Sequence, residues 1–444
     1  MKRHLPALLA TFGVFTSAFA GTLPSNITSN TVLDFANSPY TLSGPVYLAK
    51  GVVLTVKPGV LIQSSGNYSL FINGELQCLG TKDSMVRIEN TVVVFNTGSV
   101  GYKKASGTGS RFLYTWFAPG QNTSAIRSTK ASVFAQNSVF QDVGYAVSAY
   151  SDSVNITLRN CKIVGKTNGY SVYNSYKNWH LELLEDTIIE GGYLYMGSTN
   201  EVRKCLFLGG TNTYYGLYGQ LHTKQALIEC NYFKKIYYGI NLSSLASGHG
   251  RFIIRDNYVD SAYYGVYMAA MGINKDSFNI SGNSFLWCNY AAYILNDVTM
   301  PTPTNWAWPD NYWCTADTAK IKNFIYDNRR FAMIPFRIDY RNSLTQPKTP
   351  CGPVPPSFVL RAAEPQSKLS FNVYPNPATG AFVISTPDAE LRTWSLSDLN
   401  GRVLKHGRFY GEQRVETGSL KAGAYLLQVH NHAGLRQCRT VILD

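Results

Sequence analysis

Charged residues are scarce in this chain of 444 residues, where Lys, Arg, Asp and Glu together make up 15%. A coiled coil or a disordered chain would carry far more charge, and collagen would need glycine at every third position, so the composition excludes all three. Methionine is also rare, with 7 residues, against 30 tyrosines and 37 glycines. Because aromatic residues fit pleated strands and glycine fits tight turns, the composition predicts an all-β protein.

The eight cysteines include no Cys-x-x-Cys pair, and the chain has no P-loop, EF-hand loop or serine-hydrolase elbow. We therefore expect neither a bound metal nor a cofactor. A chain of this length does not need disulfides to hold a core, so most of the cysteines are expected to be small buried residues. Cys288 and Cys314 are the pair to check for a disulfide.

Long hydrophobic runs are absent beyond the first 20 residues, so no transmembrane helix is expected. Within those 20 residues, two basic residues precede an apolar stretch from Leu5 to Phe15, and small residues continue to Ala20. This is the pattern of a secretory signal peptide, and we expect cleavage between Ala20 and Gly21.

Dense basic clusters are missing as well. The formal charge is +13, and it falls to +11 without the two basic residues of the signal peptide, leaving 38 basic against 27 acidic residues. These charges are scattered and accompany no nucleic-acid-binding module, so a nucleic-acid partner is not expected. A mildly basic surface does suit an acidic polysaccharide or lipopolysaccharide.

Six-residue segments recur through the middle of the chain, which indicates a repeat architecture. Each has an apolar residue, two variable residues, then Asn, Asp or Cys, another variable residue and a final apolar one. The spacings between fourth positions are 24, 25, 19, 26, 26, 26 and 28 residues. The fourth position holds, in turn, Asn137, Cys161, Asp186, Cys205, Asn231, Asn257, Asn283 and Asn311.

Each repeat also carries a glycine corner followed by a second alternating run. Such a unit cannot bury its own apolar side, but stacked coils pair each strand with its copies about 4.8 Å away. Helical repeats are excluded because the segments alternate with period two, and a propeller blade would need about 40 to 45 residues. The repeats predict a parallel β-solenoid in which small polar side chains at one corner satisfy backbone groups.

The first coils are expected between Val46 and Ile88, where short alternating strands are separated by Pro-Gly, Asn-Gly and Gly-Thr turns. In this succession, residues 42–340 resemble secreted right-handed parallel β-helix proteins, the superfamily of pectate lyases and polygalacturonases. The resemblance implies a right-handed parallel β-helix over residues 21–344.

Residues 310–318 resemble the Asn-Tyr-Trp-Gly-Thr segment that closes many such helices, with Cys314 in place of the glycine. Apolar residues at helical spacing then predict a short capping helix near residues 317–327. Six prolines between residues 345 and 370 predict an exposed, semi-rigid linker.

Residues 371–444 alternate in the manner of a small immunoglobulin-like β-sandwich. Their motifs resemble the C-terminal sorting domain of type IX secretion cargo in Bacteroidetes-type bacteria, from which Cys438 is a departure. The resemblance implies the type IX secretion machinery as a partner, export across the outer membrane, removal of this domain, and release or attachment at the cell surface. The motif residues are Tyr374, Pro375, Asn376, Pro377, Gly401, Gly423 and Tyr425.

Catalytic motifs of the β-helix superfamily are incomplete. The Gly-His-Gly of polygalacturonases occurs around His249, but its acidic partners do not, and one histidine cannot replace the paired carboxylates of glycoside hydrolysis. Stacking the repeats brings Glu182, Glu201 and Arg203 together on outward positions, the nearest approach to a lyase site. A surface ion-pair ladder is the alternative interpretation, so the catalytic residues stay unknown.

Tyrosines recur at one corner as Tyr-Tyr-Gly, and Tyr218, Asn241, Tyr267 and Tyr293 form an outward column two residues later. The three tyrosines of that column are candidate ligand-binding residues, because aromatic rings stack on the apolar faces of sugars. A ladder that only stabilises the solenoid is the alternative.

Three hypotheses about function follow. The favoured one is an exported cell-surface or extracellular β-helix protein that binds polysaccharide or another surface partner without catalysis. The alternatives are a polysaccharide lyase or glycoside hydrolase with an unfamiliar site, and a structural adhesin.

Overall fold

The computed structural model separates the chain into two compact units, one ending at Pro356 and the other beginning at Ser357. The described residues are 21–121, 123–166, 169–174, 176–190, 193–210, 215–243, 245, 250–269, 273–295, 303–355, 371–386, 391–398, 403–418, 420–431 and 436–444. The predicted signal peptide, His249 and Gly401 therefore lie outside the described residues.

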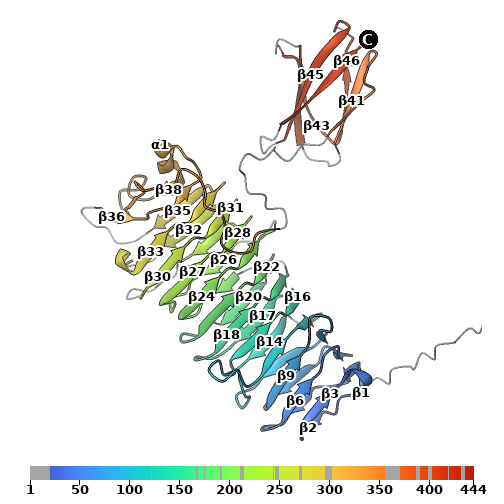
Figure 1. Cartoon of the computed structure of the whole chain (residues 1–444), viewed down its shortest axis with the longest axis vertical. Helices are drawn as coiled ribbons and strands as arrows, with labels where there is room; N and C mark the ends of the chain where they lie inside the picture. The colour runs from blue at the N-terminus through green and yellow to red at the C-terminus, as the bar shows by residue number, and fades with distance from the viewer. Residues whose placement is uncertain are drawn as a thin grey trace, which may run out of the picture. The chain divides into compact units, whose positions relative to one another are not determined.

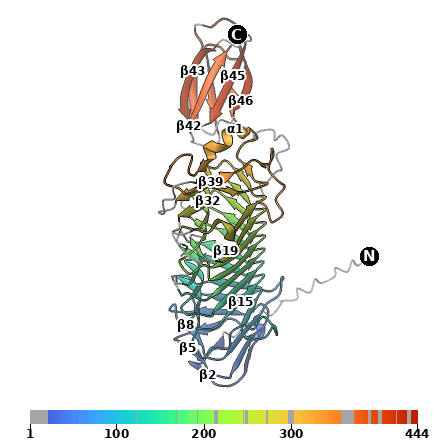
Figure 2. The same ribbon diagram turned by 90° about the vertical axis from the view of Figure 1, so that its left-hand side faces the viewer.

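The first unit is a parallel β-solenoid, as the repeats predicted, whose coils stack as rungs (Figure 1, Figure 2). Each coil contributes one strand to each of three parallel sheets, in the chain order B, C, A. Sheet A contains β1 (Gly21–Thr22), β4 (Tyr40–Leu42), β7 (Leu61–Ser64), β10 (Val86–Glu89), β13 (Thr115–Ala118), β16 (Val139–Val143), β19 (Lys162–Gly165), β22 (Thr187–Ile189), β25 (Leu206–Leu208), β28 (Tyr232–Lys234), β31 (Tyr258–Asp260), β34 (Ser284–Leu286) and β37 (Tyr312–Trp313).

Sheets B and C complete the coil. Sheet B contains β2 (Asn26–Ile27), β5 (Val46–Leu48), β8 (Ser69–Ile72), β11 (Val92–Phe95), β14 (Ser124–Ser128), β17 (Tyr145–Ala149), β20 (Tyr170–Asn174), β23 (Tyr193–Tyr195), β26 (Tyr215–Tyr218), β29 (Tyr238–Asn241), β32 (Tyr264–Ala269), β35 (Tyr290–Leu295) and β38 (Ile325–Tyr326). Sheet C contains β3 (Thr31–Leu33), β6 (Val53–Val56), β9 (Glu75–Leu79), β12 (Arg111–Leu113), β15 (Val133–Gln136), β18 (Asn155–Arg159), β21 (His180–Leu184), β24 (Thr199–Arg203), β27 (Gln225–Glu229), β30 (Phe252–Arg255) and β33 (Phe278–Ser281).

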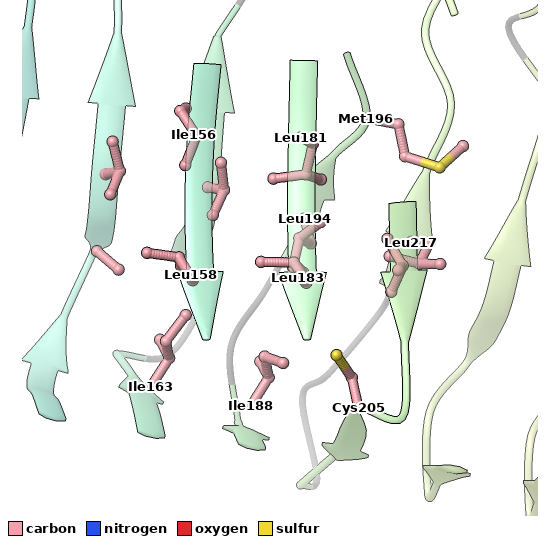
Figure 3. Packing of buried hydrophobic residues seen from close by; sticks show 14 of the residues in the cluster. Ile156, Leu158, Ile163, Leu181, Leu183, Ile188, Leu194, Met196, Cys205 and Leu217 are labelled. Carbon is pink, nitrogen blue, oxygen red and sulfur yellow. The ribbon is translucent and has the colours of Figure 1, made fainter. Parts of the chain in front are cut away.

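The core runs the length of the solenoid because inward positions repeat from coil to coil. On sheet C, Leu158 of β18 lies in register with Leu183 of β21, and both are fully buried (Figure 3). Cys205 belongs to the same interior, as predicted for most of the cysteines. Burying one such leucine contributes roughly 1.5–3 kcal/mol, so a coil gains stability only when its neighbours cover its inward residues.

The corner between sheets C and A is turned by the recurring polar residues. Where the residue is asparagine, its side-chain oxygen accepts a hydrogen bond from the backbone N–H of its counterpart on the preceding coil: Asn231 N–H to Asn257 at 3.1 Å, and Asn257 N–H to Asn283 at 3.1 Å. The Nδ2 groups of Asn231 and Asn257 each donate onward to the next asparagine and to a backbone carbonyl. This asparagine ladder satisfies the buried backbone groups at the bend, as predicted.

One register prediction was wrong. Val139 of β16 pairs with Lys162 of β19, which places Ser138 opposite Cys161, so the first spacing is 23 residues and Asn137 stands one position before the ladder. The reason is geometric: Asn137 has the left-handed φ of 52° that turns this corner, and Ser138 is the residue whose Oγ accepts a backbone N–H, that of Thr115. An asparagine suits both positions, so its identity alone does not fix the register.

The end of the solenoid is closed by short elements. Asp317 caps α1 (Thr318–Ile321) by accepting the N–H of Ala319 at 3.0 Å, and η3 (Lys322–Phe324) follows. The helical turns are shorter than the predicted helix because β38 joins sheet B beside β35. Cys314 has a φ of 62°, the left-handed conformation that glycine would adopt in the motif it resembles. Four further elements are η1 (Phe35–Asn37), η2 (Lys275–Ser277) and the parallel pair β36 (Thr304–Ala307) with β39 (Phe336–Asp339).

The expected cysteine pair is wrong, and the start of the predicted linker makes contacts that the sequence did not predict. The disulfide joins Cys230 to Cys351, whereas Cys288 and Cys314 are free thiols. The first part of the predicted linker is consequently not free chain, because Lys348 also forms an ion pair of 2.7 Å with Asp256 of the solenoid. Proline content predicted an exposed segment, but it did not reveal that a covalent bond fastens the segment to the coil surface.

The second unit consists of two antiparallel sheets, consistent with the predicted small β-sandwich. Phe382, Leu396 and Leu427 are fully buried in its own core. One sheet contains β40 (Asn372–Tyr374), β41 (Ala381–Ser385) and β44 (Glu412–Glu416), and the other contains β43 (Val403–Tyr410), β42 (Leu391–Ser397), β45 (Gly423–Asn431) and β46 (Arg436–Leu443).

Candidate functional site

Sheet B carries two adjoining columns of tyrosines, which we call the tyrosine face. Its corner column contains rings that stack from coil to coil, for example Tyr215 on Tyr238 at 4.7 Å and Tyr238 on Tyr264 at 4.8 Å between ring centroids. Its outward column contains Tyr267 stacked on Tyr293 at 5.2 Å. The corner column comprises Tyr145, Tyr170, Tyr193, Tyr215, Tyr238, Tyr264 and Tyr290, and the outward column comprises Tyr173, Tyr195, Tyr218, Tyr267, Tyr293 and Tyr326.

The outward column holds the three tyrosines singled out from the sequence, but Asn241 departs from the prediction. Strand pairing places Asn241 between Tyr218 and Tyr267, yet its side chain is 2% exposed, and its Oδ1 accepts the backbone N–H of Ser243 at 2.8 Å. Asn241 therefore turns its amide back to the chain. Sequence reasoning also missed Tyr195 and Tyr326, although the alternation Tyr-Leu-Tyr over residues 193–195 was a usable signal.

The hydroxyl groups of three tyrosines on this face, Tyr195, Tyr264 and Tyr293, stay neutral over the ordinary pH range. Burial raises the pKa of Tyr195 and of Tyr264, and it raises the pKa of Tyr293 to about 12, with neighbouring tyrosines adding to each shift. A neutral hydroxyl both donates and accepts hydrogen bonds. The face therefore combines half-buried aromatic rings with polar tips, which is the chemistry that sugar rings require.

A groove of about 680 Å³ adjoins this face where the chain turns from sheet B to sheet C. Tyr195 and Tyr218, whose rings meet edge to face at 5.3 Å, line it together with two lysines, Lys177 and Lys224. Both lysines are exposed at the rim. The groove thus pairs an aromatic wall with two positive charges.

A histidine in the same groove is held in its neutral form. The Nε2 atom of His222 accepts a hydrogen bond from the indole N–H of buried Trp179 at 3.4 Å, and burial lowers the pKa of His222. An imidazole whose Nε2 accepts a hydrogen bond keeps its proton on Nδ1. The positive charge of the groove near neutral pH therefore comes from its lysines.

The acidic cluster proposed from the sequence lies on sheet C, away from the tyrosine face of sheet B. Glu182 of β21 is only 4% exposed, and its carboxylate accepts hydrogen bonds from Arg159 at 2.7 Å and Lys104 at 2.6 Å. Burial alone would raise the pKa of Glu182, but these two cations outweigh it and the pKa is lowered. A carboxylate held in this way is a poor general base.

Glu201 and Arg203 complete that cluster without changing its character. Glu201 pairs in register with Glu182 on the neighbouring coil, and Arg203 lies 3.6 Å from the Glu201 carboxylate. Among the residues that the structure describes, no group of three His, Cys, Asp or Glu side chains is placed to hold a metal ion. The arrangement fits an ion-pair ladder that ties neighbouring coils together.

Comparison with known families adds two matches. Residues 124–285 match the model of the right handed beta helix region, and residues 372–444 match the model of the secretion system C-terminal sorting domain. This chain is a β-helix protein with a type IX sorting domain. A comparison of this chain with curated proteins found no match. Its sorting domain directs type IX secretion to the cell surface or the extracellular space.

The sorting motif of the β-helix protein has a defined structure where it is described. Asn376 fastens the start of the domain to its last strand, since its Nδ2 donates to the Thr440 carbonyl at 2.9 Å and its Oδ1 accepts the N–H of Ile442 at 2.8 Å. The Tyr425 hydroxyl donates to the Lys421 carbonyl at 2.6 Å. Within the described part of the chain, no helix has the length and apolar character needed to cross a membrane.

Proposed function

We propose that this exported protein binds polysaccharide through its tyrosine face without catalysis, and that acidic polysaccharide is the preferred ligand. The observation that carries the proposal is the groove in which Tyr195 and Tyr218 lie beside Lys177 and Lys224. Half-exposed rings can cover the apolar face of a sugar, and the two ammonium groups can pair with carboxylate or sulfate substituents. The stacked run from Tyr267 to Tyr326 extends the same surface along later coils.

We also propose the path by which the protein reaches its ligand. Residues 1–20 would be removed as a signal peptide, because two basic residues, an apolar stretch and small residues up to Ala20 form the pattern of one. Residues 21–344 would then form the binding body, residues 345–370 would connect it to residues 371–444, and the latter would serve the type IX machinery of a Bacteroidetes-type bacterium. The match to the sorting-domain model supports this arrangement.

The test measures retention and chemistry together. The purified full chain is run through gels containing an acidic or a neutral polysaccharide, and the same mixtures are assayed for new reducing or unsaturated ends. We expect retention by acidic polymers that weakens as salt is added, because surface charges are screened, and no new ends. New ends would overturn the non-catalytic proposal in favour of a lyase or hydrolase, and absence of both signals would favour a structural adhesin.

Matched variants locate the binding surface. Replacing Tyr218 with alanine removes one stacking ring, worth roughly 1–1.5 kcal/mol, so retention should weaken by about tenfold. Lys224→Ala should weaken the binding of acidic polymers and leave any binding of neutral polymers unchanged. Tyr47→Ala is the control, because Tyr47 is 42% exposed on the same sheet, stacks on Phe71 and lies outside the groove. If Tyr47→Ala and Tyr218→Ala reduced retention equally, the groove would not be the binding site.

A further inference from the structure

The segment from Leu344 to Gly352, which we call the strap, runs back over the solenoid instead of leaving it at the cap (Figure 1). Leu344 donates its N–H to the Asn311 carbonyl at 3.0 Å. Lys348 then donates its N–H to Ser284 Oγ at 2.9 Å, and Cys351 is bonded to Cys230.

These contacts lie on successively earlier coils. Asn311, Asn283, Asn257 and Asn231 are consecutive members of the asparagine ladder, and the strap meets residues beside each of them. It therefore crosses about three coils, or about 14 Å along the solenoid axis. The strap is therefore fastened to the solenoid beside the coil of Cys230, well before the cap.

The disulfide is the strong attachment among the described contacts of the strap. The Lys348–Asp256 ion pair has side chains that are 43% and 34% exposed, and ion pairs in such positions contribute little in water. The corner underneath does not depend on the strap, because Asn231 and Asn257 bond to their own ladder neighbours. Cys351 is exposed, so a reductant in solution can reach the bond.

We propose that the Cys230–Cys351 disulfide is a redox-controlled clamp that holds the strap on the surface of the solenoid. A dithiol reductant opens it: one thiolate attacks the Cys351 sulfur, the Cys230 thiolate leaves and takes up a proton, and the second reductant thiol then releases Cys351 as a thiol. The reductant becomes a cyclic disulfide. The strap is then released from the coils back to Leu344, while the coils themselves stay folded.

Limited proteolysis of the full chain tests the clamp. A lysine-specific endoproteinase needs a locally unfolded segment, so cleavage after Lys348 should be at least tenfold faster with dithiothreitol than without it. Cys351→Ser should be cleaved at the fast rate without reductant and should show no further response. Cys205→Ser is the matched control, because Cys205 is a free thiol buried in the solenoid, and it should respond to the reductant as the parent does.

Far-UV circular dichroism recorded on the same samples completes the test. An unchanged β spectrum together with faster cleavage supports the clamp. Equal cleavage rates in the oxidised and reduced protein would overturn it, because the weaker contacts would then be sufficient to hold the strap. Loss of the β spectrum on reduction would also overturn it, because the bond would then be holding the coils themselves.

Discussion

Asp186 gives the sharpest prediction, because it puts an acid into the buried corner ladder. Its Oδ1 accepts the Cys161 N–H at 2.6 Å and its Oδ2 accepts the Leu184 N–H at 3.0 Å. Burial raises the pKa of Asp186 from 3.8 to about 8, although the two backbone donors act in the opposite direction. The folded protein therefore keeps a proton on this residue that the unfolded chain has already lost above about pH 4.

The sign of the effect follows from this difference in bound protons. Between about pH 4 and pH 8 the folded state holds one more proton at Asp186 than the unfolded state, so the free energy of unfolding falls as the pH rises. About three pH units separate 3.8 from pH 7, and each is worth about 1.4 kcal/mol, which gives roughly 4 kcal/mol. Asp186→Asn removes this cost but loses the Leu184 hydrogen bond, worth about 1 kcal/mol. We expect a net gain of roughly 3 kcal/mol at pH 7 and little or none at pH 4.

Urea unfolding of the parent and of Asp186→Asn at several values between pH 4 and pH 8 measures this difference. The gap between the two curves should widen steadily with pH. Asn257→Asp is the counterpart. In the parent, the Asn257 amide donates to the Ile228 carbonyl and to Asn283 Oδ1, so the variant places a carboxylate beside two acceptor oxygens. It should therefore destabilise the protein more at pH 8 than at pH 4. A gap that does not change with pH, or a less stable Asp186→Asn at pH 7, would refute the reasoning.

Three further predictions concern the remaining elements of the solenoid, each measured by urea unfolding of the purified variant. Glu182→Gln should cost about 2 kcal/mol at neutral pH, with the difference shrinking as acid protonates the parent, and should leave polysaccharide retention unchanged; lost retention would instead place Glu182 in the binding site. Gly265→Val should cost more than about 2 kcal/mol, because a Cβ there would lie 2.6 Å from the Ala291 carbonyl oxygen, and a neutral result would contradict this packing. Leu183→Ala should cost about 2–5 kcal/mol, and a cost below about 1 kcal/mol would mean that the coils collapse around the cavity.

The solenoid could be predicted from the sequence because its signal is repeated. Strand pairing confirms the register between Leu158 and Leu183 and between Val202 and Ile228, since each pair is set by two apolar residues and one corner residue at fixed spacing. The register at Asn137 was wrong because the left-handed corner position and the ladder position that follows it both accept asparagine. A repeat therefore establishes the number of residues per coil more securely than it establishes which residue of each coil occupies the ladder position.

The candidate site was harder to predict from the sequence, because it depends on contacts between segments that share no motif. Lys104 reaches Glu182 from a position 78 residues away, and nothing in the spacing of either residue indicates the pair. The Cys230–Cys351 bond spans 121 residues and fastens a proline-rich segment that reads as linker. The tyrosine face could be predicted in part. Its stacked members were visible as repeats in the sequence, whereas the positions of Lys177 and Lys224 beside it follow only from the geometry of the coils.

The asparagine ladder gives the solenoid the equivalent of a reading frame. Counted from one ladder residue to the next, coils of 19, 25, 26 and 28 residues coexist in this chain, yet their corner residues remain in register. Surplus residues are therefore accommodated at the other corners, as in an insertion that does not disturb the frame. Removing one whole coil should join two in-frame neighbours and shorten the tyrosine face by a single step, whereas removing half a coil should put every later coil out of frame.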